Sequence, residues 1–157
     1  MLFRSRRREA ALSYLARNAD SWSEDERLTL AEGAVALIAD ARFAHAFAPG
    51  SQAEVSIVGR LDRPGQPPAL VSGQIDRLVV TEREVLIVDY KTNHAPPKSP
   101  AEAPPGYIRQ LALYRAVLAK LYPGRSVRAA LVWTEVPDLM ELSLEVLEAA
   151  LAQVKVA

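Results

Sequence analysis

The amino-acid sequence predicts an α/β (α+β) domain in which a central mixed β-sheet is flanked by helices. Two observations predict this class. Helix-like segments open and close the chain, and between them three strand-like runs follow one another, succeeded by a further helix-like segment and a fourth run. Strands and helices arranged in this order are typical of α/β and α+β architectures. At 157 residues, half of them hydrophobic, the chain is also long enough to bury a core of its own.

Composition limits the domain organisation and the kinds of site. We expect a single domain over 1–157, with a helical part at 1–50 and the core at 51–157. The chain has no cysteine, which excludes disulfides, thiolate zinc sites and cysteine-ligated iron–sulfur clusters. The formal net charge of zero gives no overall attraction to nucleic acid, so affinity for DNA would need local basic patches and a metal ion.

Hydropathy and the first residues bear on location. No apolar run reaches transmembrane length, and no signal peptide opens the chain. We therefore expect a cytoplasmic protein without a membrane partner.

The first 50 residues are expected to form two helices. The first starts with a basic cluster, Arg4-Ser5-Arg6-Arg7-Arg8, which is either a phosphate contact or a solvated terminus. Ser23 and Glu26 form a capping-box pattern that starts the second. Ala48-Pro49-Gly50 ends the helical pattern. His45, just before it, has no partners at metal-ligand spacing, so we expect it to be structural.

Three strand-like runs follow. They span Glu54 to Leu61, Ala69 to Val80 and Val85 to Lys91 and are rich in β-branched and leucine side chains. A turn rich in proline and glycine joins the first two at 63–68, and polar residues 82–84 join the second to the third. Gly73, inside the second strand, indicates a bulge or a close approach of DNA backbone.

Two carboxylates stand on neighbouring strands. Asp76 ends an apolar segment of the second strand and Asp89 stands at the exit of the third, so pairing of these strands would bring the two side by side. Carboxylates this close repel each other unless a cation lies between them, and Mg²⁺, which prefers oxygen ligands, is a natural partner. The sequence therefore predicts a divalent metal site here.

A lysine adds a third functional group. Residues i and i+2 of a strand share a face, so Lys91 would project beside Asp89 while Tyr90 turns away. A bound cation would polarise a phosphoryl oxygen, and Lys91 would orient the attacking water or neutralise charge on the phosphate. This combination predicts a site for phosphodiester hydrolysis.

The stretch 92–106 contains five prolines, at 96, 97, 100, 104 and 105, and is expected to be a loop. It is either a flap over a bound strand or a plain connector. As a flap it would offer Asn93 and Lys98 to phosphates.

A helix is predicted at Tyr107 to Tyr122. Gln110 and Tyr114 are four residues apart in it and share a face, where they either bridge the helix to the sheet or line the site. A strand at 127–134, a short strand at 139–142 and a closing helix capped by Ser143 complete the elements. Trp133 is expected in the core rather than as a stacking platform for bases.

Three motifs in order carry a resemblance to a known family. Gly73-Gln74-Ile75-Asp76-Arg77, Asp89-Tyr90-Lys91 and Gln110-Leu111-Ala112-Leu113-Tyr114 resemble those of the RecB-like branch of the PD-(D/E)XK nucleases. Within this branch the chain is similar, from about residue 10 to its end, to the C-terminal nuclease domain of AddA-type helicase–nucleases, which process double-strand DNA breaks in bacteria.

The resemblance implies a restriction-endonuclease-like fold and a Mg²⁺-dependent deoxyribonuclease, an exonuclease of the RecB/AddA type, with Mn²⁺ as a substitute ion. It places the activity in double-strand break repair and recombination. The implied partners are DNA and the helicase and nuclease subunits of an AddAB-type complex.

The resemblance also assigns roles to residues. Asp76, Asp89 and the backbone carbonyl of Tyr90 would bind the metal, with Glu54 as an accessory ligand, and Lys91 would complete the catalytic set. The residues expected to contact DNA are Gln110, Tyr114, Arg77, Thr92, Asn93 and Lys98.

One departure from the family leaves an alternative open. RecB-like nucleases usually carry a further ligand histidine in a Gly-x-x-x-His type pattern on a helix before the first strand. Residues 1–44 contain no such pattern, and His45 lacks the glycine context. The chain is then a fragment of a larger helicase–nuclease, weakly active or inactive by itself, or a shortened homologue. The alternative function is a catalytically incomplete nuclease-fold module that binds DNA or a partner protein.

Overall fold

The computed structural model describes residues 2–63, 65–92 and 95–154. The chain divides into two compact units, Met1–His45 and Ala46–Ala157. Each unit is considered by itself below. In the part of the chain that is described, no helix combines the length and the hydropathy needed to cross a bilayer.

The first unit consists of helices. Its elements are α1 (Leu2–Asn18), α2 (Glu24–Ala39) and a short 3₁₀ helix, η1 (Ala41–Phe43). The capping box predicted at the start of α2 is confirmed: Ser23 Oγ accepts from the Glu26 amide at 3.2 Å, and the Glu26 carboxylate accepts from the Ser23 amide at 2.7 Å. These bonds satisfy amides that the helix itself leaves without partners, and so they fix where α2 begins.

The second unit is built on one five-stranded sheet in the order β1-β2-β3-β4-β5. β1 pairs with β2, and β2 with β3, in antiparallel fashion, β3 and β4 are parallel, and β5 is antiparallel to β4. The sheet is therefore mixed, as the sequence predicts. Its strands are β1 (Ser51–Arg63), β2 (Gln66–Val80), β3 (Glu84–Lys91), β4 (Ser126–Trp133) and β5 (Asp138–Leu142).

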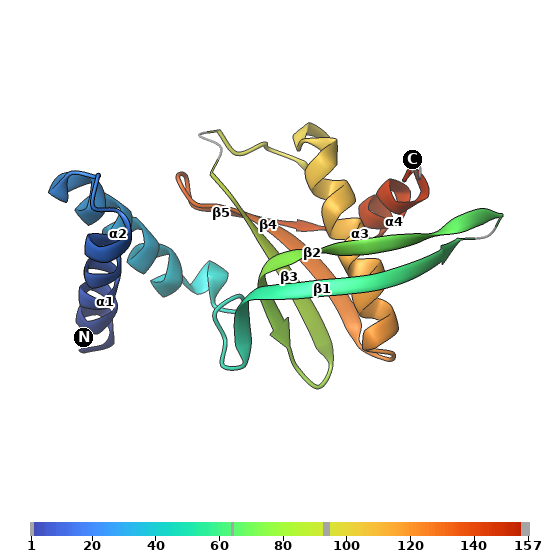
Figure 1. Ribbon diagram of the computed structural model, residues 1–157, viewed down its shortest axis with the longest axis horizontal. Coiled ribbons are helices and arrows are strands. Elements are labelled where there is room, and N and C mark those ends of the chain that lie inside the picture. The colour runs from blue at the N-terminus through green and yellow to red at the C-terminus, as the bar shows by residue number, and fades with distance from the viewer. Residues whose placement is uncertain (1, 64, 93–94, 155–157) are drawn as a thin grey trace. The chain divides into compact units, whose positions relative to one another are not determined.

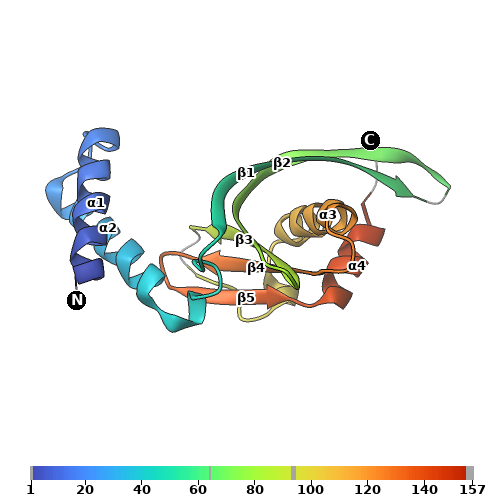
Figure 2. The same ribbon diagram turned by 90° about the horizontal axis from the view of Figure 1, so that it is seen from below.

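A helix provides the connection that a parallel strand pair requires. From β3 the chain passes through a short 3₁₀ helix, η2 (Pro100–Glu102), into α3 (Pro105–Leu121) and then into β4. α3 contacts β1, β2, β3 and β4, and the last helix, α4 (Leu144–Ala152), packs beside it. Figures 1 and 2 show the long β1–β2 hairpin curving over α3.

The core lies between α3 and the face of the sheet that α3 covers. Val85 and Ile87 of β3 point into it together with Leu131 and Trp133 of β4, and all four are buried. The predicted fold class, with its mixed sheet and flanking helices, is thus confirmed, as is the core position of Trp133. The opposite face of the same two strands is also apolar and buried, with Leu86, Val88, Ala130 and Val132.

Two local differences from the predicted elements involve proline. β2 begins at Gln66, so Pro67 and Pro68 lie in a strand where a turn was expected. The register between β1 and β2 shifts between Leu61 and Arg63, and the prolines fall at this irregularity, where a missing N–H donor interrupts no regular ladder. In the proline-rich loop, Pro100 starts η2, since proline is tolerated in the first turn of a helix.

Candidate active site

The antiparallel pairing of β2 and β3 brings Asp76 next to the end of β3. Arg77 lies opposite Val88, so Asp76 and Asp89 occupy the next positions along the two strands. The Tyr90 amide donates a 2.7 Å hydrogen bond to Asp76 Oδ2, which holds this carboxylate against the exit of β3. The two carboxylates therefore come from neighbouring strands, close enough that Asp76 acts electrostatically on Asp89.

Strand alternation sends Asp89 and Lys91 to the face covered by α3. Lys91 Nζ forms an ion pair with Asp89 Oδ2, and both side chains are largely buried, 13% and 8% exposed. Tyr90 points to the other face, where its hydroxyl accepts from Arg77 Nε at 2.9 Å. The geometry follows from the period of two residues in a strand.

Burial decides the electrostatics of Asp89. Removal from water raises the pKa of this carboxyl group, the neighbouring Lys91 ammonium opposes the rise, and the Asp76 carboxylate adds to it. The ionised form of Asp89 is thus held in an unfavourable environment, which the Lys91 ammonium group partly offsets. A cation at this position would favour ionisation, because opposite charge stabilises the carboxylate.

The donor set at this point fits a hard divalent cation. Asp89 Oδ2 is buried, and its partner in the described part of the chain is the Lys91 ammonium group. Asp76 supplies a second carboxylate. The Tyr90 amide points toward Asp76, and in a strand the carbonyl of a residue points to the same edge as its N–H, so the Tyr90 carbonyl faces that side as well.

The protein ligands at this site are few. Among the described residues, no group of three or more His, Cys, Asp and Glu side chains is arranged to hold a metal ion. Two carboxylates and a carbonyl suit Mg²⁺, which keeps several waters and commonly takes one or two carboxylates together with substrate phosphates.

Glu54 lies on β1 opposite Asp76, between the pairs Ala53↔Arg77 and Val55↔Ile75. Its side chain is exposed, and its backbone has a φ of 55°, in the left-handed region that favours glycine. The carbonyl of Glu54 accepts from Gln74 Nε2 at 3.4 Å. The structure thus places Glu54 beside the carboxylates in the sheet, on an irregular stretch of backbone.

The same point is where β2 changes face. Ile75 and Leu78 both belong to the core under α3, although regular alternation would send them to opposite faces. The alternation therefore breaks between them, next to Glu54. This break lets Asp76 share a face with Leu78 and Asp89 while Ile75 still packs under α3.

One side of α3 lies along the site. Lys91 Nζ sits 3.9 Å from the centroid of the Tyr107 ring, in a cation–π contact. One turn further along the helix, Gln110 is half-buried and its Nε2 donates to Tyr114 Oη at 3.2 Å. The structure therefore aligns Tyr107, Gln110 and Tyr114 along the inner side of α3.

Tyr114 is buried against Gly73 of β2, with only 6% of its surface exposed. A Cβ at Gly73 would overlap Tyr114 Oη and lie 2.7 Å from Cζ. Gly73 is needed here because the tyrosine ring occupies the space of a side chain. Gly73 is in regular register with Ile57, so the strand has no bulge there. The close neighbour is the Tyr114 side chain of the same chain, and not the DNA backbone of the second interpretation.

The other residues expected to contact DNA are dispersed. Arg77 lies on the opposite face, where it donates to Ser51 Oγ at 2.9 Å and stacks 4.8 Å from the Phe47 ring centroid. Thr92 and Lys98 have exposed side chains. Asn93 lies outside the described residues.

One residue of the site, Tyr107, was missed in the sequence, and the core residue Trp133 lies beside the site. Tyr107, under Lys91, is seven residues before Tyr114, and this two-turn spacing was the signal that places both on one side of α3. Trp133 lies in register with Lys91 and is fully buried, and its Nε1 has no hydrogen-bond partner among the residues described. Nothing in the sequence distinguishes it from other core tryptophans.

Comparison with known proteins identifies the class to which this fold and this pair of carboxylates belong. The chain matches the PD-(D/E)XK nuclease superfamily over residues 2–155, and it therefore belongs to that superfamily. Its members in general are nucleases that use divalent metal ions, with DNA as the implied substrate. The chain is also similar to a solved structure described as "Crystal structure of SSO0001", with 13% identity and a TM-score of 0.43, over 93% of this chain and 70% of that one. No curated protein matches it.

Proposed function

We propose that the protein is a Mg²⁺-dependent deoxyribonuclease of the RecB/AddA type, acting in the processing of double-strand breaks. The observation that carries this proposal is the buried ion pair of Asp89 with Lys91 beside Asp76. The order of the three motifs supports the RecB-like branch. The proposed partners are DNA and the subunits of an AddAB-type complex.

The metal ligands and Lys91 have separate tasks in this proposal. Asp76, Asp89 and the Tyr90 carbonyl would hold the ion, with Glu54 as an accessory ligand, and a bound ion would supply Lewis-acid polarisation of the phosphate and of water. Lys91 occupies Asp89 Oδ2, one of the oxygens that a metal ion would take. With an ion bound to Asp89, this ammonium group would be free to act on the phosphate or on the attacking water.

α3 contributes positioning and DNA contact. The Tyr107 ring supports the Lys91 ammonium group, and Tyr114 fixes the Gln110 side chain by a hydrogen bond. Among the proposed DNA contacts, Gln110, Thr92 and Lys98 have accessible side chains, whereas Tyr114 is buried and Arg77 is engaged on the other face. We propose that the first three meet the DNA backbone and that Tyr114 acts through Gln110.

A second candidate function is a catalytically incomplete module that binds DNA or a partner protein. The observation in its favour is the small ligand set, since among the described residues no group of three or more His, Cys, Asp and Glu side chains is arranged to hold a metal ion. Binding without cleavage under all metal conditions would support this alternative.

The test separates metal binding from cleavage through Lys91. Lys91→Met should retain Mn²⁺ in calorimetry, with equal or tighter affinity because a competing cation is removed, and should lower the cleavage rate by about 100- to 1,000-fold. Asp89→Asn should weaken Mn²⁺ binding and abolish cleavage together. Lys120→Met, at an exposed lysine, is the matched control and should behave as wild type. Equal cleavage by wild type and Lys91→Met would remove the lysine from the mechanism.

A further inference from the structure

A second site lies at the other end of the β3–β4 pair. A pocket of about 600 Å³ is formed by α3, the start of β4, and the junction of β5 with α4. Ser126 and Val127 of β4 lie opposite Glu84 and Val85, the first residues of β3, whereas Asp89 lies four residues further on. At about 3.3 Å per residue the two sites are separated by roughly 13 Å along the strand.

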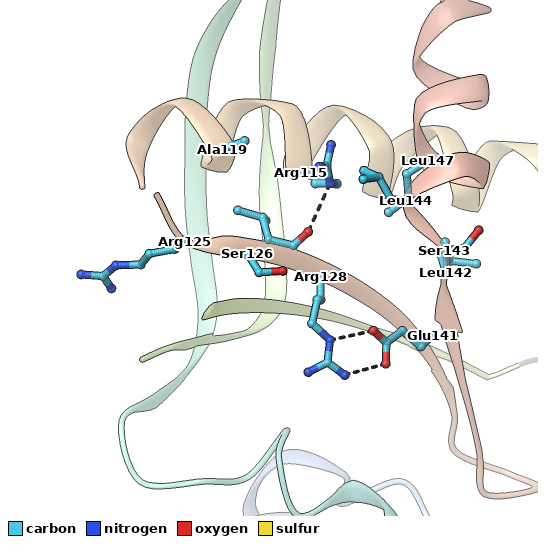
Figure 3. A pocket seen from close by; sticks show the side chains of 11 residues that line it. Arg115, Ala119, Arg125, Ser126, Arg128, Glu141, Leu142, Ser143, Leu144 and Leu147 are labelled. Atoms are coloured by element: carbon cyan, nitrogen blue, oxygen red, sulfur yellow. Dashed lines mark hydrogen bonds and ion pairs between the residues drawn. The ribbon is translucent and has the colours of Figure 1, made fainter. Parts of the chain in front are cut away.

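The pocket exists because β5 is short. The register of β5 with β4 ends at the pair Ala129↔Leu142, so Ser126–Arg128 have no partner in β5. The chain turns at Ser143 into α4 instead of continuing along β4. Figure 3 shows the resulting space between α3, β4 and the start of α4.

The charged side chains that line the pocket are three arginines and one glutamate. The glutamate, Glu141, is occupied by Arg128, which donates to its two oxygens at 2.6 Å each and also donates to Glu84 at 2.9 Å. Arg128 is thus fully balanced by carboxylates. Arg115 and Arg125 remain without a carboxylate partner in the part of the chain that is described.

Arg115 is a lining residue whose hydrogen-bond donors are only partly used. It comes from α3, is half-buried, and donates only its Nε, to the Val127 carbonyl at 3.2 Å. This bond, drawn as a dashed line in Figure 3, restrains the guanidinium group, and its two terminal nitrogens have no partner among the described residues. A restrained guanidinium fork with its donors available matches the geometry of a phosphate or carboxylate.

The remaining walls are apolar. Leu142 and Leu147 are buried at the floor, and Leu144 is 52% exposed at the rim. A volume of several hundred Å³ with an apolar wall and one convergent polar anchor is characteristic of sites for small organic ligands. The first turn of α4 adds a favourable dipole for negative charge on the same side.

We propose that this pocket binds the phosphate of a nucleotide, either free or at the end of a strand, through Arg115, with the base or sugar against Leu144 and Leu147. The inference rests on the proposed nuclease function, which provides nucleotides as products and strand ends as substrates. Arg125 lies at the edge of the pocket, where its Nη1 donates to the Thr81 carbonyl at 2.6 Å. It contributes positive charge to the pocket.

The test measures binding to the full chain in EDTA, where cleavage is absent. The probes are inorganic phosphate, thymidine, thymidine 5′-monophosphate and a 5′-phosphorylated ten-nucleotide oligothymidine, each followed by calorimetry. The monophosphate should bind more tightly than thymidine or phosphate. Arg115→Met should raise its Kd by about 10- to 100-fold, as expected for loss of a charge-assisted pair of hydrogen bonds. Arg60→Met, an exposed arginine on β1, is the matched control and should leave Kd unchanged.

A second variant keeps the proposal testable if Arg115→Met does not fold. Leu144→Asp places a negative charge at an exposed rim position in the first turn of α4, where acidic residues are tolerated, and should also weaken binding. Tighter binding of the monophosphate than of the oligonucleotide assigns the site to free nucleotides, and the reverse assigns it to strand ends. Nucleotide affinity that is unchanged in both variants, or thymidine binding equal to that of its monophosphate, would overturn the proposal.

The two proposals fail separately. If the protein cleaves DNA with Mg²⁺ but its nucleotide binding does not depend on Arg115, only the proposal of the second site is refuted. Nucleotide binding that depends on Arg115 in a protein without any cleavage refutes the nuclease proposal and leaves the site in place.

Discussion

At the scale of single residues, Glu54 is held in a backbone conformation that suits glycine. Its φ of 55° costs a side-chain-bearing residue about 1–2 kcal/mol. Glu54→Gly should therefore raise the free energy of unfolding by about 0.5–1 kcal/mol, after the larger chain entropy of glycine is subtracted. Urea denaturation of the metal-free protein measures this change.

The control for this variant is Gln52→Gly. Gln52 is an exposed residue of the same strand and is not among those with positive φ, so glycine there should destabilise by about 0.5–1 kcal/mol. A loss of stability in Glu54→Gly equal to that of the control would contradict the argument. The variant also tests the accessory metal role, because unchanged Mn²⁺ affinity would exclude Glu54 as a ligand.

Asp89 is predicted to lower stability in the absence of metal. Burial raises the pKa of Asp89 in the folded state, so stability falls as pH rises through the interval between its ordinary and its raised pKa. Asp89→Asn removes this effect and should stabilise the protein at pH 7 in EDTA, where the wild-type carboxylate is ionised in an unfavourable environment. The gain should shrink toward acid pH, where the wild-type carboxyl group takes up a proton.

Asp62→Asn is the matched control for this prediction. Asp62 is exposed, and its hydrogen bond with Lys120 lowers its pKa, so its removal should bring no gain at pH 7. Denaturation curves at pH 5 and pH 7, with and without Mn²⁺, measure both variants. If Asp89→Asn is no more stable than wild type at pH 7 in EDTA, ionised Asp89 is adequately stabilised by Lys91.

At the scale of elements, the contact between β2 and α3 depends on Gly73. Gly73→Ala would force its Cβ into the Tyr114 ring and should destabilise the protein by about 1–3 kcal/mol, as overpacking does in well-packed cores. Tyr114→Phe in the same chain removes the nearest atom and should recover part of the loss. Thermal unfolding of the single and double variants gives the coupling between the two positions.

Gly106→Ala provides the comparison. Gly106 lies in the first turn of α3, and a Cβ there meets nothing within 4 Å, so this substitution should be neutral or stabilising. Equal stabilities of Gly73→Ala and Gly106→Ala would show that the sheet and α3 separate readily at this contact.

At the scale of the whole molecule, the balance of charge predicts weak binding to DNA without a metal ion. The formal net charge is zero, so non-specific attraction to phosphates is small. Without divalent ions we expect a Kd for duplex DNA no tighter than about 10⁻⁶ M at physiological salt. A plot of log K against log salt concentration has a slope of about −0.9 for each phosphate contacted, and we expect a small slope because few phosphates are contacted. Fluorescence anisotropy over a salt series measures the slope.

Calcium ions provide the decisive condition, since Ca²⁺ occupies oxygen sites of this type. Added Ca²⁺ should tighten binding by wild type and not by Asp89→Asn. Equal effects on both proteins would place the metal-dependent contact elsewhere.

Several features could be predicted from the sequence because they depend on neighbours in the chain. The capping box of α2 needs only Ser23 and Glu26, and the shared face of Asp89 and Lys91 needs only the two-residue period of a strand. The mixed sheet followed from the order of strands and helices. The family followed from three motifs in order, whereas its narrower RecB and AddA assignment remains a proposal.

Other features were decided by contacts between residues far apart in the chain. The change of face in β2 lies beside the positive φ of Glu54 on β1, and regular alternation gives no sign of it. On the other face, Arg77 meets Ser51, which is 26 positions away in the sequence, and Tyr90 of the neighbouring strand. Arg115 and Glu141 line the same pocket, but Glu141 pairs with Arg128, while Arg115 donates its Nε to the Val127 carbonyl. Local periodicity fixes the direction of a side chain along its own element, but only the packing of elements determines which partner it meets.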